Sequence, residues 1–101
     1  MAKYGDTKNI TFTSKKGEET KFVLNHIGLQ GSFELRERAE NEMTGKTSMT
    51  KLHKELFEHV IRAVDDAGDA TKVNYSFFEG KEDGAKMLNE VTSEAVSYIF
   101  Q

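Results

Sequence analysis

Apolar and polar residues alternate in two short runs near the start of the chain. Residues 9–13 place Ile10 and Phe12 on one face of an extended backbone, and residues 20–24 repeat this pattern. A period of two residues is typical of a strand with one buried face. Because the segment between the runs contains Gly17, which favours a tight turn, the pattern predicts a β-hairpin.

Three later segments carry apolar residues at helical spacing instead. The first follows Ser32, which offers an N-cap oxygen, and is predicted to run to Met43 with Leu35 and Ala39 on its apolar face. This apolar stripe is narrow and most other positions are polar or charged. The helix is therefore expected on the outside of the domain.

The second helical segment has the broadest apolar face. Thr47 or Ser48 is expected to cap it, and the helix is predicted to continue to Val64. Spacings of one, three and four residues are typical of an amphipathic helix packed on a core. The apolar positions are Met49, Leu52, Leu56, Phe57, Val60, Ile61 and Val64.

The last third of the chain is predicted to contain a loop and a final helix. Residues 65–69 are a loop by composition. Residues 72–78 fit either a short third strand or an aromatic lead into the last helix. The final helix is predicted over 83–99, because Gly80 and Gly84 would each weaken an earlier start by about 1 kcal/mol relative to Ala.

These elements predict an α+β fold. The N-terminal β-hairpin, with or without the third short strand, would pack with about three α-helices. A chain of 101 residues is in the range of one domain. We therefore expect residues 1–101 to form a single domain, with residues 1–8 as a flexible N-terminus.

The composition is that expected of a folded, soluble protein inside the cell. Seven Phe and three Tyr within a 37% hydrophobic content can fill a core, whereas 31% charged residues favour a solvated surface. Without cysteine there is no disulfide framework or thiolate zinc site, one of which is usual in a small secreted domain. The polar N-terminus lacks the apolar run of a signal peptide, and no apolar run is long enough to span a membrane.

The net charge of -3 argues against nucleic acid as a partner. Non-specific phosphate binding needs a basic patch, whereas 14 Lys and Arg are interspersed here among 17 Asp and Glu. A small DNA-binding regulator would also need a basic recognition helix, and the predicted helix over 48–64 has three cations against two carboxylates. Such a regulator is the least favoured of the functions considered.

Two short motifs suggest a phosphate or metal site, but each lacks what the chemistry requires. Residues 45–47, Gly-Lys-Thr, match the end of a phosphate-binding loop, yet Glu40 stands where the first glycine would be. His53 and His59 would be separated by about 120° around a helix, so they cannot share a metal ion side by side. A helix-to-helix turn and two surface or boundary histidines are the favoured interpretations.

The acidic loop also departs from a known cation site. An EF-hand loop that begins at Asp65 would need glycine and glutamate where the chain has Ala70 and Ser76. There is no Gly-x-Ser-x-Gly elbow and no cysteine nucleophile. We therefore expect no catalytic residue, no cofactor and no metal.

The apolar face of the final helix has two interpretations. It could be a face of the domain's own core, or it could be a docking surface for a partner helix. Methionine suits an adaptable contact because its side chain is flexible and polarizable. The residues that would make the docking surface are Met87, Leu88, Val91, Ala95, Tyr98, Ile99 and the adjoining Phe100.

A further set of segments carries a family resemblance. In chain order they are residues 10–14 with Gly17-Glu18, His26-Ile27-Gly28, residues 35–41 (Leu-Arg-Glu-Arg-Ala-Glu-Asn), residues 56–61 (Leu-Phe-Glu-His-Val-Ile), residues 75–78 (Tyr-Ser-Phe-Phe) and residues 87–91 (Met-Leu-Asn-Glu-Val). Spread over nearly the whole chain, they resemble tail assembly chaperones of long-tailed phages and prophages of Gram-positive bacteria.

The resemblance implies a non-enzymatic function in the cytoplasm of the bacterial host. The protein would bind the tape measure protein, recruit tail-tube subunits, and be absent from the mature virion. An acidic domain with exposed helical faces can shield a long apolar helix without a cofactor. The oligomeric state stays open, with a homo-oligomer as one alternative. The second expectation is another small phage structural or connector protein that the virion retains.

Overall fold

A computed structural model of the chain describes residues 3–40 and 43–100. Four strands form one antiparallel sheet whose spatial order follows the chain, β1-β2-β3-β4. The strands are β1 (Thr7–Thr13), β2 (Glu19–Asn25), β3 (Ile61–Val64) and β4 (Ala70–Lys72). This sheet is one layer of the fold.

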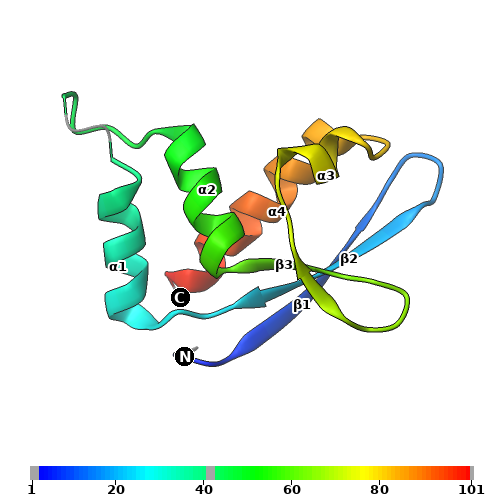
Figure 1. Ribbon diagram of the computed structural model, residues 1–101, viewed down its shortest axis with the longest axis horizontal. Coiled ribbons are helices and arrows are strands. Elements are labelled where there is room, and N and C mark those ends of the chain that lie inside the picture. The colour runs from blue at the N-terminus through cyan, green and yellow to red at the C-terminus, as the bar shows by residue number, and fades with distance from the viewer. Residues whose placement is uncertain (1–2, 41–42, 101) are drawn as a thin grey trace.

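Helices make up the second layer. In the described part of the chain they are α1 (Gly28–Arg38), α2 (Met49–His59), α3 (Tyr75–Glu79) and α4 (Gly84–Ile99). They lie on one side of the sheet (Figure 1), with α1 and α2 between β2 and β3 in the chain. The predicted α+β fold is therefore confirmed.

The predicted N-terminal hairpin is present. Ile10 pairs with Phe22, and Phe12 with Thr20, so Ile10, Phe12 and Phe22 share the face that the helices cover. Gly17 has a φ of +88° in the connecting loop. Glycine adopts this left-handed conformation without a steric penalty, which fits the sharp reversal between β1 and β2.

The second helix is shorter than predicted. Ser48 caps it, because its hydroxyl accepts a hydrogen bond from the backbone N–H of Lys51, but the helix ends at His59 and not at Val64. Residues 61–64 form β3 instead. Ile61 and its β-branched neighbours favour an extended backbone, and β2 offers a strand to pair with. The predicted extension of the helix to Val64 was wrong for this reason.

Arg62 stabilises the switch from helix to strand. Its guanidinium donates hydrogen bonds to the carbonyl oxygens of Phe57 at 3.1 Å, Glu58 at 2.8 Å and Ile61 at 2.9 Å. The carbonyls of the last helical turn have no partner within the helix, so they need donors from elsewhere. One side chain of β3 thus supplies donors where α2 ends.

The first helix begins earlier than the sequence predicts. It starts at Gly28, so Ser32 lies in its second turn and is not its N-cap. The buried Oγ of Ser32 is 2.7 Å from the carbonyl oxygen of Gly28 and 2.8 Å from that of Ile99. A serine at this depth needs such acceptors, and the second one joins α1 to the last turn of α4.

The same helix also ends earlier than predicted. Its last residue is Arg38, and Met43 is an exposed residue of the following loop. The carbonyl oxygen of Ala39 accepts a hydrogen bond from the N–H of Ser48 at 2.7 Å, and Glu40 forms an isolated β-bridge with Thr47. These bonds turn the chain back toward α2, so the backbone cannot continue as a helix to Met43.

Residues 72–78 divide between two elements. Lys72 is the last residue of β4, Val73 and Asn74 lie in neither element, and Tyr75 begins α3, so the alternative of a third strand over 72–78 is wrong and the segment is an aromatic lead to the last helix. The side chain of Asn74 caps α3 by accepting a hydrogen bond from the N–H of Phe77 at 3.1 Å. The predicted loop over 65–69 joins β3 to β4, and the final helix begins at Gly84, as the glycines indicated.

The segment predicted as a flexible N-terminus, residues 1–8, includes residues that belong to the sheet. β1 begins at Thr7, and the turn before it is hydrogen-bonded to the residue after β2. The N–H of Gly5 donates to the carbonyl of His26 at 3.1 Å, and the N–H of His26 donates to the carbonyl of Asp6 at 2.8 Å. These bonds extend the hairpin ladder beyond the alternating pattern. Residues 1 and 2 lie outside the described residues.

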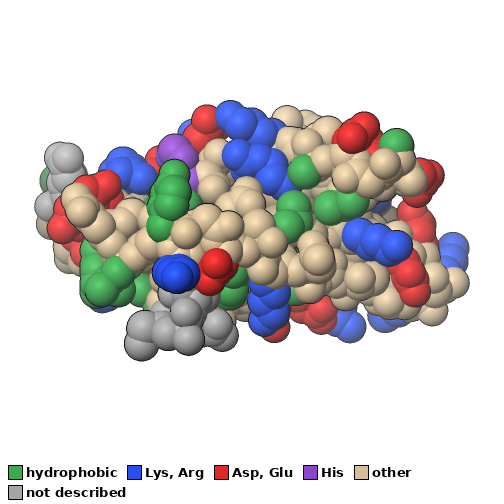
Figure 2. Space-filling model, turned by 90° about the horizontal axis from the view of Figure 1, so that it is seen from below, with side chains coloured by type: hydrophobic (Ala, Val, Ile, Leu, Met, Phe, Trp, Pro, Cys, Tyr) green, Lys and Arg blue, Asp and Glu red, His purple; other side chains and the backbone are tan. Residues whose placement is uncertain are grey.

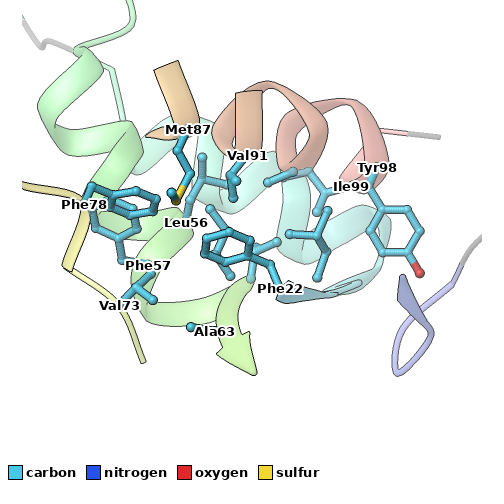
Figure 3. Packing of buried hydrophobic residues seen from close by; sticks show 14 of the residues in the cluster. Phe22, Leu56, Phe57, Ala63, Val73, Phe78, Met87, Val91, Tyr98 and Ile99 are labelled. Atoms are coloured by element: carbon cyan, nitrogen blue, oxygen red, sulfur yellow. The ribbon is translucent and has the colours of Figure 1, made fainter. Parts of the chain in front are cut away.

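The core fills the space between the sheet and the helices (Figure 3). The ring of Phe22 on β2 stacks on Phe78 of α3 at 6.0 Å, and Phe78 stacks on Phe57 of α2 at 5.8 Å. Aromatic burial of this kind contributes strongly to a small core. The contribution of α4 is Met87, Val91, Ala95, Tyr98 and Ile99.

No helix of the described residues covers the opposite face of the sheet. Seen from below, backbone and uncharged polar side chains make up most of it (Figure 2). Thr7, Asn9, Thr11 and Thr13 of β1 are exposed, in alternation with the residues that face the core. An antiparallel sheet can be solvated on one face in this way.

Candidate functional site

The predicted docking face of α4 lies mostly inside the protein. Leu88 is partly buried against the core, and Phe100 is 39% exposed. The other five residues are buried: Met87, Val91, Ala95, Tyr98 and Ile99. Docking through those five side chains would require α4 to leave the sheet, so only Phe100 of this set is well placed to meet a partner.

Contacts at its last turn hold α4 in that position. The ring of Tyr98 meets the ring of His26 at 5.2 Å, nearly edge to face, and the carbonyl of Ile99 accepts a hydrogen bond from Ser32. Lys8 of β1 forms an ion pair with Glu94 at 3.3 Å. The helix is thus connected to β1, to the residue after β2 and to α1.

Phe100 belongs to a different apolar surface. Its ring meets that of Phe33 on α1 at 5.8 Å, and Phe100 lines a hollow together with Leu52 of α2 and Val96 of α4. Leu52 and Val96 also line a neighbouring hollow with Met49. We call these five residues, Phe33, Met49, Leu52, Val96 and Phe100, the three-helix patch.

The three-helix patch is exposed to an unusual degree for such large apolar residues. Phe33 is 48% exposed and Met49 is 59% exposed. Leu52 and Val96 are partly buried between them and pack on the core. Contiguous apolar surface with aromatic residues is typical of protein contact sites. The patch is therefore the best candidate for a functional site in the described part of the chain.

One charged side chain lines the patch. Arg36 of α1 borders the hollow that holds Phe100. Within residues 3–40 and 43–100, Arg36 is in none of the ion pairs, whereas its neighbour Arg38 pairs with Glu55. A carboxylate on a partner could therefore meet Arg36 without breaking a pair already present.

Sequence reasoning found one residue of this patch and missed the others. Phe100 stood out as an aromatic residue next to an amphipathic helix. Met49 and Leu52 were assigned to the apolar face of α2, and Phe33 carried no periodic signal because it lies off the stripe of its own helix. The residues of the patch come together only where α1, α2 and α4 pack against one another, and the spacing of residues within one helix does not predict that packing.

The histidines are not arranged as a metal site. His26, in the connection after β2, and His53, on α2, are both buried, while His59 is exposed at the end of α2. Nowhere in the part of the chain that the structure describes do three side chains of His, Cys, Asp or Glu gather closely enough to hold a metal ion. The Nδ1 of His26 instead accepts a hydrogen bond from the N–H of Gly28 at 3.0 Å.

His53 is expected to make stability depend on pH. Burial lowers the pKa of His53, and its Nδ1 shares a hydrogen bond with the hydroxyl of Tyr75 at 2.8 Å. An unfolded histidine protonates near pH 6.5, so below that pH the unfolded state binds more protons than the folded one. Stability should be fully present above about pH 6.5 and should fall as the pH drops toward the folded pKa.

The measurement is urea unfolding at a series of pH values for the native protein and for His53→Gln. The His53→Gln variant should show a flatter decline of the unfolding free energy below about pH 6.5. An unchanged slope in His53→Gln would contradict the role given to its burial.

The other two motifs have structural roles. The Oδ1 of Asp65 accepts hydrogen bonds from the N–H groups of Ala67 at 3.0 Å and Asp69 at 2.8 Å, which shapes the turn between β3 and β4. Residues 45–47 lie in the connection from α1 to α2 and not between a strand and a helix. A phosphate-binding loop needs the strand that is missing there.

None of the helices in the described residues is long and apolar enough to cross a membrane. Comparison of the chain with protein-family models, with curated proteins and with solved structures found no match. The three-helix patch and the geometry around it, together with the sequence resemblance, are therefore the basis for a functional proposal.

Proposed function

We propose that the protein is a non-enzymatic phage tail assembly chaperone. It binds the tape measure protein and recruits tail-tube subunits in the cytoplasm of the bacterial host, and it is absent from the mature virion. The family resemblance of the sequence supports this role. The structural observation that carries the proposal is the three-helix patch, which offers exposed apolar surface to a client.

The patch suits a helical client. Phe33 and Phe100 would act as aromatic anchors, and the hollow lined by Leu52 and Val96 would accept apolar side chains from one face of an amphipathic helix. A carboxylate of the client would face Arg36 at the border of this hollow. Binding of this kind shields apolar surface of the client until assembly, and it needs no cofactor.

Co-expression with the tape measure protein tests the proposal. We expect a soluble complex that co-purifies with the native chain and that is lost when Phe33→Glu and Phe100→Glu are combined. Both side chains are partly exposed already, so the charges should cost little folding stability while they disrupt an apolar contact. Circular dichroism and thermal unfolding of the isolated variant would check that it folds.

Tyr4→Glu is the matched control. Tyr4 is 80% exposed and lies outside the patch, so the same change of an aromatic residue to a carboxylate should leave the complex intact. A double variant that still co-purifies, or a tape measure protein that is soluble alone, would contradict the proposal. Retention of the protein in purified phage particles would favour the structural or connector role instead.

A further inference from the structure

The outer edge of β1 is a second candidate binding surface, because its outward backbone N–H and C=O groups have no hydrogen-bond partner among the described residues. The N–H of Ser14 donates to the carbonyl of Glu18 at 2.8 Å, and the N–H of His26 donates to the carbonyl of Asp6 at 2.8 Å. With the observed register, the even-numbered residues of β1 exchange hydrogen bonds with β2. The intervening residues of an antiparallel ladder point their N–H and C=O groups the other way. On β1 these residues are Thr7, Asn9, Thr11 and Thr13.

Nothing in the described residues occupies this edge. No loop or helix donates a hydrogen bond to these outward backbone groups or accepts one from them. Proteins usually protect a long edge strand with a proline, a bulge or an inward-pointing charge. β1 has seven residues without proline or bulge, and its one charged side chain, Lys8, is paired with Glu94.

A groove accompanies the edge. It lies between β1 and α4, with Ile10, Thr11 and Phe12 on the strand side. The α4 residues that line it are Asn89, Glu90, Val91, Ser93 and Glu94. A strand edge beside a helix can bind an extended peptide, since the backbone supplies the hydrogen bonds and the groove receives every second side chain.

The groove is also charged on one side. Glu94 is neutralised by Lys8, but Glu90 is in none of the ion pairs within the described ranges. A Lys or Arg side chain of a bound segment could reach Glu90, while an apolar side chain would lie against Ile10, which is only partly buried. The groove therefore selects an extended segment that is apolar and basic.

We propose that β1 binds such a segment of another protein as a fifth strand of the sheet. A second copy of this chain suits the edge poorly. Two copies joined through antiparallel β1 strands would place their α4 helices alongside each other, with the unpaired Glu90 of both copies brought together. The proposal does not depend on the chaperone function, because the three-helix patch uses other side chains.

Amide hydrogen exchange measured by NMR tests the proposal directly. The probe is a synthetic peptide of seven residues, as long as β1, in which Thr alternates with Val and the central Val is replaced by Lys. At millimolar concentration it should protect the amides of Thr7, Asn9, Thr11 and Thr13. The amides of Ile10 and Phe12 already face β2, so their protection should change little.

Two variants locate the binding site. Thr11→Pro removes an outward N–H but no bond to β2, so the sheet should persist while the peptide binds at least about tenfold more weakly. Glu90→Lys should reverse the charge preference, so that a peptide with Glu in place of its Lys binds better than the original. The second variant tests the groove even if proline at position 11 unfolds the protein.

Three results would overturn the proposal. The four outward amides could stay unprotected with the peptide present, or Glu90→Lys could leave the charge preference as it is. Alternatively, the same amides could be protected without peptide and more so at higher protein concentration, which would make a second copy the occupant of the edge. Protection by the peptide together with reversal by Glu90→Lys would support it.

Discussion

Gly84→Ala is expected to destabilise the protein by about 1–3 kcal/mol, because the added methyl group has no room. A Cβ at this position would collide with the carbonyl group of Phe78 at the end of α3. Phe78 is buried and stacks on Phe22 and Phe57. The backbone of α3 could retreat only by moving this ring, so the collision would disturb the aromatic core.

Gly80→Ala is the matched control for that prediction. Its Cβ would meet the carbonyl oxygen of Ser76 at 3.6 Å, an ordinary van der Waals distance, and Gly80 has a φ of -80° that alanine adopts freely. This substitution should be neutral or stabilise by up to about 1 kcal/mol. Urea unfolding of both variants measures the difference. Equal stabilities would show that α3 and α4 are not packed as closely as the structure indicates.

Arg62→Ala should cost about 1.5–3 kcal/mol, because a charged donor is lost from three carbonyl groups at once. The oxygens of Phe57, Glu58 and Ile61 would lose these hydrogen bonds where α2 gives way to β3. Arg62→Lys should recover only part of this, since an ammonium group cannot match the planar fork of the guanidinium. Thermal unfolding would rank the variants.

Lys72→Ala is the matched control for Arg62→Ala. It removes a positive charge at a neighbouring position without removing the hydrogen bonds that Arg62 donates to the carbonyl groups. Lys72 lies opposite Arg62 on β4 and pairs with Glu58 at 2.7 Å, and the hydrogen bond and charge of Lys72 lower the pKa of that carboxylate. Both partners are largely exposed, so removal of Lys72 should change stability little. If Arg62→Ala were no more harmful than Lys72→Ala, the helix-capping role of Arg62 would be refuted.

Local pattern predicted the hairpin, the Ser48 cap and the start of α4, and it failed where a distant strand decides the conformation. Ile61 continues the helical spacing of the preceding residues, so the sequence near it favours a longer helix. Its pairing with Leu24 of β2 favours a strand instead. A segment that fits two periodicities takes its structure from the partner that is available.

The candidate site was still less predictable than the fold. The face of α4 carries a clear amphipathic signal, yet that signal describes core residues such as Val91. Phe33 and Met49 become part of one surface only after α1, α2 and α4 have packed against one another. Exposure depends on the whole fold, whereas periodicity reports only which residues share a face of their own element.

α4 follows the sheet and the other described helices in the chain, and this order bears on how the core forms during synthesis. The sheet and the first three helices leave the ribosome before residues 84–99, which supply Met87, Val91 and Ile99 to the core. Until then Phe12 and Leu24 of the growing chain lack the part of the core that α4 supplies. Ser32 can meet the carbonyl of Ile99, 67 residues further along, only after that stretch is synthesised. The nascent chain therefore exposes apolar surface until α4 has been synthesised, and the core can close only after that point.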